Sequence, residues 1–164
     1  MRLLVFSDSH GRWERMKEII NRSNADAVLF LGDGMRDIDR VLSGYNGKAM
    51  FISVKGNCDG YDGTPEERIL TLDGIKILML HGHSRGVKHG REVLEAYGRL
   101  NGADLILYGH THQAEVRYVS EYDSPYYVFN PGSIGAHRYD GASYGYIELV
   151  DGKAVPNIVE YYED

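Results

Sequence analysis

Short, mostly apolar runs recur along the first two thirds of the chain, at residues 3–6, 27–31, 50–54, 75–80 and 105–108. Runs of this length that are bounded by glycine and polar residues predict buried β-strands. Between them, apolar residues recur three or four positions apart. This spacing predicts helices over residues 13–22, over the stretch between Gly34 and Gly44, and from residue 89 or 90 to residue 100. Strands that alternate with helices predict the α/β class.

Two Asp-Gly pairs predict tight hairpins and refine this picture. Asp73-Gly74 separates residues 69–72 from residues 75–78, so the first sheet is expected to be mixed rather than purely parallel. After residue 112 the pattern changes to short alternating strands at 114–120, 126–130, 144–150 and 154–161, the last two joined by Asp151-Gly152. These antiparallel strands predict a second sheet packed on the first. The expected fold is α/β, with two mixed β-sheets packed face to face and flanked by helices.

Length and composition fit one globular domain spanning residues 1–164, with 43% hydrophobic and 26% charged residues. No apolar run approaches the roughly 20 residues of a membrane-spanning helix, and the first residues lead into Ser7 and Asp8 rather than a cleavage site. We therefore expect a cytoplasmic protein without a membrane partner. The single cysteine, Cys58, excludes an internal disulfide, and the net charge of −6 argues against a stable nucleic-acid complex.

Each of the five apolar runs is followed by side chains that bind metal ions. Because strand ends in an α/β sheet lie along one edge, residues far apart in sequence are expected to meet there. Seven such side chains form the candidate site: Asp8, His10, Asp33, Asn57, His81, His110 and His112. Carboxylate, imidazole and amide ligands suit Mn, Fe, Ni or Zn. Two such ions close together promote phosphoester hydrolysis, so the sequence predicts a two-metal hydrolase.

The same residues lie in motifs that resemble those of a known family. Asp8-Ser9-His10, Gly32-Asp33, Gly56-Asn57, His81-Gly82-His83 and Gly109-His110-Thr111-His112 look like the five motifs of the calcineurin-like metallophosphoesterases, in the same order. Gly56-Asn57-Cys58-Asp59 and Asn130-Pro131-Gly132-Ser133 resemble the small YfcE-like phosphodiesterase branch. The resemblance covers about residues 3–135. It implies a four-layer αββα sandwich.

The resemblance also implies a role for each ligand. One metal ion would be held by Asp8, His10, Asp33 and His112, and the other by Asp33, Asn57, His81 and His110, with Asp33 bridging the two. A carboxylate can bridge because each of its oxygens can bind one ion. The implied reaction is hydrolysis of phosphodiesters, and weakly of some phosphomonoesters, by a metal-bridging hydroxide. The residues that we expect to take part in catalysis are Asp33, Asn57, Cys58, His81 and His110. We expect manganese, with nickel, iron or zinc as alternatives.

Cys58 departs from the pattern of the larger family. Most members have a histidine here that is thought to protonate the leaving group, and a thiol replaces it poorly. We therefore expect better turnover of diesters and aryl esters than of alkyl monoesters. Two other interpretations of Cys58 stay open, namely a cysteine nucleophile and a small residue that only fills space. Arg36, three residues after Asp33, either meets a substrate phosphate or is an exposed helix-start arginine.

Several residues around the motifs have two interpretations. Asn130-Pro131-Gly132-Ser133 either shapes the substrate cleft or forms a turn. Four basic residues could form a rim for an anionic substrate or be dispersed surface charges: Lys55, Arg85, Lys88 and Arg91. Eleven of the thirteen tyrosines lie from Tyr97 onward, where they could support a homo-oligomer interface.

Two other functional classes compete with the phosphodiesterase. A protein-interaction scaffold is possible because the retromer subunit of this fold has a degraded metal site, whereas here every ligand position keeps a metal-binding side chain. A nuclease is possible because related repair enzymes share the motifs, but the acidic charge balance disfavours it. The expected partner is a small phosphodiester or nucleotide-like substrate.

Overall fold

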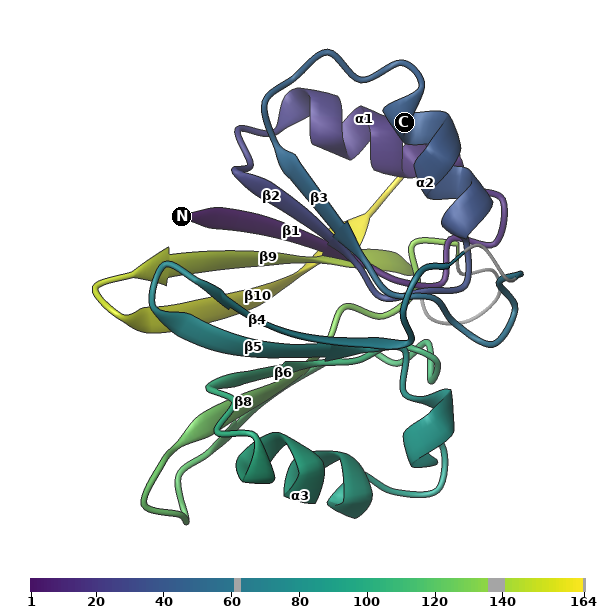
Figure 1. Cartoon of the computed structure of the whole chain (residues 1–164). Helices are drawn as coiled ribbons and strands as arrows, with labels where there is room; N and C mark the ends of the chain where they lie inside the picture. Colours follow the sequence, from purple (N-terminus) through teal and green to yellow (C-terminus); the bar gives the residue numbers. More distant parts are fainter. Residues whose placement is uncertain (61–62, 136–140, 164) are drawn as a thin grey trace.

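The computed structural model describes residues 1–60, 63–135 and 141–163. Its elements are, in chain order, β1 (Arg2–Phe6), α1 (Trp13–Arg22), β2 (Ala27–Phe30), α2 (Met35–Leu42), β3 (Met50–Ser53), β4 (Glu67–Leu72), β5 (Ile75–Leu80), the 3-10 turn η1 (His83–Arg85), α3 (Glu92–Leu100), β6 (Leu105–Leu107), β7 (Glu115–Val119), β8 (Tyr126–Asn130), β9 (Ala142–Val150) and β10 (Lys153–Tyr161). Two five-stranded sheets pack face to face, with α1 and α2 outside one sheet and α3 outside the other (Figure 1). The predicted α/β sandwich of two mixed sheets is confirmed.

The assignment of strands to the two sheets differs from the expectation. The first sheet has the order β10-β9-β1-β2-β3, and the second has the order β4-β5-β6-β8-β7. The C-terminal hairpin β9–β10 therefore joins the first sheet, where β9 runs antiparallel to β1, while the Asp73-Gly74 hairpin belongs to the second sheet. A hairpin signal fixes the pairing of two neighbouring strands, but it does not say which sheet edge they join.

The apolar residues of β1 explain how the layers pack. Leu3 and Val5 face the second sheet and belong to the core between the sheets, whereas Leu4 and Phe6 face α1 and α2. This follows from the period of two in a strand, where successive side chains point to opposite faces. A third cluster packs Leu94 of α3 against the outer face of the second sheet. Strands buried on both faces read as continuous apolar runs, which is why the sequence revealed them clearly.

The element boundaries lie close to those predicted. The third helix begins at Glu92 rather than at residue 89 or 90, and η1 precedes it. Within the described residues, no helix combines the length and the apolar character that crossing a membrane requires. The carboxyl ends of β1, β2, β5 and β6 lie at the same end of the sandwich, where their loops meet (Figure 1).

Candidate metal centre

The loops at this end bring candidate ligands from both sheets together. Asp8 follows β1 and Asp33 follows β2 in the first sheet, whereas His81 follows β5 and His110 follows β6 in the second. The convergence at strand ends is thus as predicted, but the site lies across the junction of two sheets rather than on one edge.

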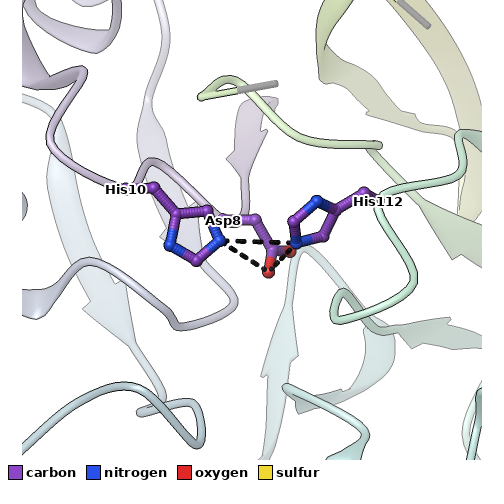
Figure 2. A group of neighbouring side chains, drawn as sticks. All are labelled: Asp8, His10 and His112. Atoms are coloured by element: carbon purple, nitrogen blue, oxygen red, sulfur yellow. Dashed lines mark hydrogen bonds and ion pairs between the residues drawn. The ribbon is translucent and has the colours of Figure 1, made fainter. Parts of the chain in front are cut away.

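One group of possible ligands consists of Asp8, His10 and His112 (Figure 2). Oδ1 of Asp8 lies 3.0 Å from Nε2 of His112 and 3.8 Å from Nε2 of His10, and the two imidazole nitrogens are 3.4 Å apart. Although Oδ1 of Asp8 is fully buried, it has no hydrogen-bond partner in the described part of the chain. A buried carboxylate oxygen that faces two imidazole nitrogens in this way fits a divalent cation.

A second group consists of Asp33, His81 and His110. Nε2 of His81 lies 3.3 Å from Oδ2 of Asp33 and 3.2 Å from Nδ1 of His110. Both Asp33 and His81 are buried, and His110 is partly buried. The chemistry of the donors again matches a transition-metal site, with one carboxylate and two imidazoles.

His81 connects the two groups. Its Nε2 atom also lies 3.9 Å from Oδ1 of Asp8, while its Nδ1 atom lies 2.7 Å from the carbonyl oxygen of Leu31. A carbonyl accepts hydrogen bonds, so Nδ1 donates and Nε2 is left to face the carboxylates. Asp33 belongs to one of the two groups only, so its predicted bridging role stays a prediction.

The charges at the site favour a bound cation. Burial acts to raise the pKa of Asp33, but hydrogen bonds from His81 and from the Cys58 N–H bring it well below the usual value. Burial acts to lower the pKa of His81, but the hydrogen bond to Asp33 and the charge of Asp8 raise it overall. Burial and the charge of His81 lower the pKa of His110 to about 4. Asp33 therefore stays charged and His110 stays neutral, as metal binding requires, whereas a metal ion has to compete with a proton at His81.

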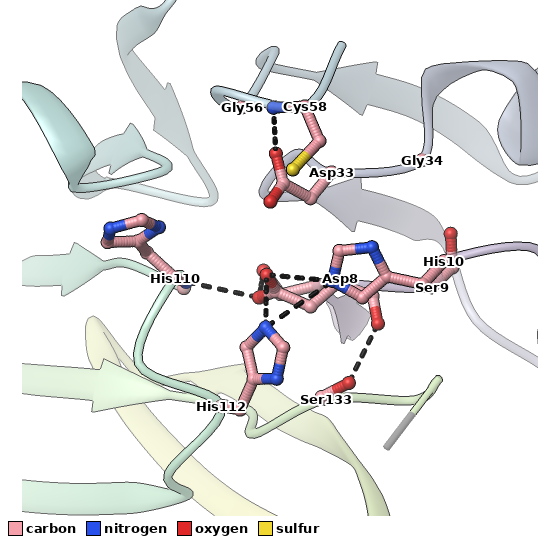
Figure 3. Close-up of polar contacts among 12 residues, drawn as sticks. Asp8, Ser9, His10, Asp33, Gly34, Gly56, Cys58, His110, His112 and Ser133 are labelled. Atoms are coloured by element: carbon pink, nitrogen blue, oxygen red, sulfur yellow. Dashed lines mark hydrogen bonds and ion pairs between the residues drawn. The ribbon is translucent and has the colours of Figure 1, made fainter. Parts of the chain in front are cut away.

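Asn57 and Cys58 lie at the edge of the second group. The Cys58 N–H donates to Oδ1 of Asp33 at 2.8 Å, and its sulfur points toward the same carboxylate (Figure 3). The hydrogen bond to Asp33, with burial and nearby carboxylates, raises the pKa of the Cys58 thiol to about 11, which disfavours a thiolate nucleophile. Asn57 is exposed, and its Nδ2 atom lies 3.5 Å from the Cys58 sulfur. Among the described contacts, none joins the Asn57 side chain to another candidate ligand.

The backbone is unusual at most of the candidate ligands. Positive φ angles occur at five of them: Asp8 (53°), His10 (42°), Asp33 (60°), His110 (67°) and His112 (60°). The other non-glycine residues with positive φ in the described part of the chain are Asp73 and Asp151, in the two predicted hairpin turns. Left-handed backbone is disfavoured for residues with a Cβ and is concentrated at functional sites.

Asp59 supports the second group, although the sequence analysis gave it no role. Its carboxylate accepts hydrogen bonds from the N–H groups of Asp33, Gly34, Met35 and Gly56, each at 2.8 Å. It therefore caps the N-terminus of α2, whose own N-cap residue is a glycine without a side chain. The missing local cap is the signal that could have pointed to a distant acceptor.

Three other polar side chains hold the loops that carry Asp8 and His110. Oδ2 of Asp8 accepts hydrogen bonds from the hydroxyl of Ser7 at 2.6 Å and from the N–H of His110 at 3.1 Å. The Ser133 hydroxyl donates to the carbonyl of Asp8 at 2.7 Å (Figure 3). The Asn130 amide donates to the carbonyl of Gly109 at 3.1 Å, beside His110. The Asn130-Pro131-Gly132-Ser133 segment is buried, and these hydrogen bonds position the ligand loops.

Comparison with known proteins identifies the family. The sequence model of the calcineurin-like phosphoesterase superfamily domain matches residues 1–152. The chain belongs to this superfamily. Among curated relatives, the probable metallophosphoesterase YsnB of Bacillus subtilis is 35% identical over 140 residues, which cover 84% of this chain and 78% of YsnB. Phosphodiesterase YfcE of Escherichia coli K12 is 30% identical over 172 residues, which cover 90% of this chain and 88% of YfcE. The predicted resemblance is confirmed, and this superfamily member is a phosphoesterase.

Solved structures agree with the family. A predicted phosphoesterase from Streptococcus pneumoniae TIGR4 superposes with a TM-score of 0.79 at 27% identity, covering 97% of this chain and 88% of that one. Vps29 of Entamoeba histolytica, solved in complex with zinc, superposes with a TM-score of 0.73 at 25% identity, covering 98% and 99%. The fold is therefore shared by proteins of different names, and the site must decide the function.

Proposed function

We propose that this phosphoesterase hydrolyses phosphodiesters, and weakly some phosphomonoesters, with two divalent ions held by the predicted ligands. Those ligands are Asp8, His10, Asp33, Asn57, His81, His110 and His112. One observation carries the proposal: six of these side chains, contributed by both sheets, form an unbroken series of ligand-to-ligand contacts that passes through His81. Metal-dependent hydrolysis is the chemistry that such a cluster supports best.

The charge of the site suits a phosphate substrate. Asp8 and Asp33 are the only anionic ligands of the proposed set, so two divalent ions would leave a positive surplus. When bound, the ions would activate a water molecule and stabilise the negative charge that develops on the phosphoryl oxygens. The imidazole ligands contribute no negative charge and preserve this surplus.

The chain's own nucleophiles near the site are engaged in other contacts. The hydroxyl of Ser7 donates to Asp8, and that of Ser9 donates to Asp37 at 2.6 Å. Both serines are buried. Because Asp33 keeps the Cys58 thiol protonated, a side-chain nucleophile is disfavoured and water is the proposed attacking group.

Manganese is the proposed native ion, with nickel, iron or zinc as alternatives. The mixture of carboxylate and imidazole ligands supports all four, since availability as well as affinity decides which ion is loaded. Measuring hydrolysis of bis(p-nitrophenyl) phosphate after loading each ion in turn ranks them. Activity with magnesium but with none of these four ions would contradict this choice of metals, because magnesium prefers oxygen ligands to imidazole nitrogens.

The central test is the Asp33→Ala variant. We expect it to lose bound metal and at least about 100-fold in diester hydrolysis, because it removes a direct ligand. Asp123→Asn removes a carboxylate from an exposed turn and is the matched control. A wild-type protein that binds metal but hydrolyses no diester would overturn the proposal.

That negative result would favour a protein-interaction scaffold, the second candidate. Vps29 has this fold and has been solved with zinc, so metal content alone does not separate the two functions and turnover must be measured. A nuclease is the third candidate. It predicts cleavage of long single-stranded DNA under conditions that hydrolyse small diesters, whereas our proposal predicts none. A single domain, a cytoplasmic location and homo-oligomers remain predictions.

A further inference from the structure

Two cavities flank the candidate ligands. The α3 cavity, of about 970 Å³, is lined in part by Lys88, Arg91, Tyr108, Thr111, Glu115 and Arg117. The α2 cavity, of about 760 Å³, is lined in part by His10, Arg36, Asp39, Arg40, Cys58 and Asp59. The α2 cavity includes His10 and Asp33 in its wall, and the α3 cavity includes Thr111, which lies between His110 and His112 in the sequence, so each cavity adjoins the ligand loops of one sheet. A phosphodiester has two ester substituents, and each cavity can receive one.

Two of the three glutamates in the wall of the α3 cavity have basic partners. Oε2 of Glu115 accepts a hydrogen bond from the Tyr108 hydroxyl at 2.5 Å and lies 3.3 Å from Nη1 of Arg91. Glu95 forms an ion pair with Arg117. The third, Glu92, is exposed, so three glutamates balance the three basic residues of this cavity.

Lys88 is the basic residue of this cavity that is not engaged. It is exposed, and within the described residues it has neither an ion pair nor a hydrogen bond from its side chain. Thr111, between two candidate ligands, lines the same cavity. A lysine without a described partner thus shares this cavity with Thr111, which joins His110 to His112.

The wall of the α2 cavity is more acidic. Its wall includes Arg36 and Arg40, but also the carboxylates of Asp37, Asp39 and Asp59. Acidic groups outnumber basic ones here even when Asp33 is left out. A substituent with an additional negative charge is therefore favoured in the α3 cavity rather than in the α2 cavity.

We propose that the α3 cavity binds one ester substituent of the substrate and that Lys88 binds a second phosphate carried by that substituent. A lysine ammonium binds phosphate as a compact point charge and needs no fixed orientation. This inference rests on the proposed phosphodiesterase function and narrows its substrate class. The preferred substrate is a diester with a further phosphate on one arm, as in a nucleotide-derived diester, rather than a diester with two uncharged arms.

A matched pair of substrates tests the proposal. Thymidine 5′-(p-nitrophenyl phosphate) and its 3′-phosphorylated form have the same scissile bond and differ by one phosphate. We expect the wild type to show a KM about three- to tenfold lower for the phosphorylated form, the range expected of one partly exposed ionic contact. Lys88→Ala should bring the ratio of the two KM values close to one, and Lys88→Arg should restore most of it. Lys153→Ala, an exposed lysine at the start of β10, should keep the wild-type ratio.

Equilibrium binding separates this inference from the proposed function. Calorimetry with thymidine 3′,5′-bisphosphate and thymidine 5′-phosphate compares the same extra phosphate without turnover. If the wild type hydrolyses neither ester, the proposed function fails, and the binding ratio alone decides the role of Lys88. Equal KM values and equal affinities for the two members of each pair would overturn the Lys88 subsite. Loss of the ratio in Arg36→Ala but not in Lys88→Ala would also overturn it.

Discussion

Nε2 of His81 lies 3.3 Å from Oδ2 of Asp33, although His81 follows a strand of the second sheet and Asp33 follows a strand of the first. The other ring nitrogen of His81 donates to the carbonyl of Leu31, which directly follows β2 of the first sheet. One imidazole is thus fixed by backbone on one side and meets a carboxylate on the other. This contact joins the two sheets within the second group, and the same Nε2 atom lies 3.9 Å from Oδ1 of Asp8, which connects the second group to the first.

Replacing His81 by phenylalanine keeps a ring of similar shape and removes both nitrogens. We expect His81→Phe to lose metal binding by more than the roughly 10- to 100-fold typical of a residue that only orients a ligand. Metal content after purification and calorimetric titration with manganese measure the change. His89→Phe, at an exposed histidine outside both ligand groups, is the control and should bind metal normally. Normal metal affinity in His81→Phe would contradict the linking role.

Asp59→Ala removes the acceptor of four backbone hydrogen bonds. We expect the free energy of unfolding to fall by about 2–4 kcal/mol, since a helix cap and several charge-assisted hydrogen bonds are lost together. Metal affinity should fall as well, because the loop that carries Asp33 is released. Urea denaturation measures the first effect and calorimetry the second. Asp39→Ala, at an exposed position of α2, should change neither, and an unchanged unfolding midpoint in Asp59→Ala would refute this role.

Gly109 has no room for a side chain. A Cβ atom there would lie 1.9 Å from the hydroxyl oxygen of Ser7 and 2.9 Å from Oδ2 of Asp8. Ser7 is buried and hydrogen-bonded, so it cannot easily move aside. We expect Gly109→Ala to lower the free energy of unfolding by about 1–3 kcal/mol and to weaken metal binding. Gly60→Ala, where a Cβ would meet nothing within 4 Å, is the control for both measurements.

Cys58 predicts a preference among substrates. A protonated thiol assists a departing alkoxide poorly, so bis(p-nitrophenyl) phosphate should have a higher kcat/KM than a sugar phosphate with the same metal. Cys58→His should raise the kcat/KM for the sugar phosphate about tenfold or more relative to the diester, because an imidazole can donate a proton. Cys58→Ser lacks such a donor and should not. A wild type that strongly prefers the sugar phosphate would reject this account.

Local patterns predicted the elements of the fold well, but not their assembly. The apolar run before Asp8 and the Asp73-Gly74 hairpin both gave correct strands, because periodicity and turn chemistry act over a few neighbouring residues. The pairing of β9 with β1 joins residues such as Ile147 and Leu3, which are far apart in sequence. No local signal encodes that pairing, so the sheet membership of the C-terminal hairpin was predicted wrongly.

The residues of the candidate site were likewise predicted only in part. Ligand chemistry at strand ends pointed to residues such as Asp8 and His81, and the structure brings them together. The groups that hold the ligands in place, such as Asp59 and Ser133, act through backbone hydrogen bonds that depend on tertiary contacts. Likewise, Lys88 and Thr111 line one cavity although they are distant in sequence. Residues of this kind carry no distinctive spacing, so only the three-dimensional arrangement reveals them.

A centre whose ligands are divided between two sheets has a mechanical consequence. Each cation would act as a crosslink between the halves of the sandwich. Removing the ions should lower the melting temperature, and adding them back should restore it. The melting temperature of this protein should therefore report how fully its cations are loaded, even before any substrate is known.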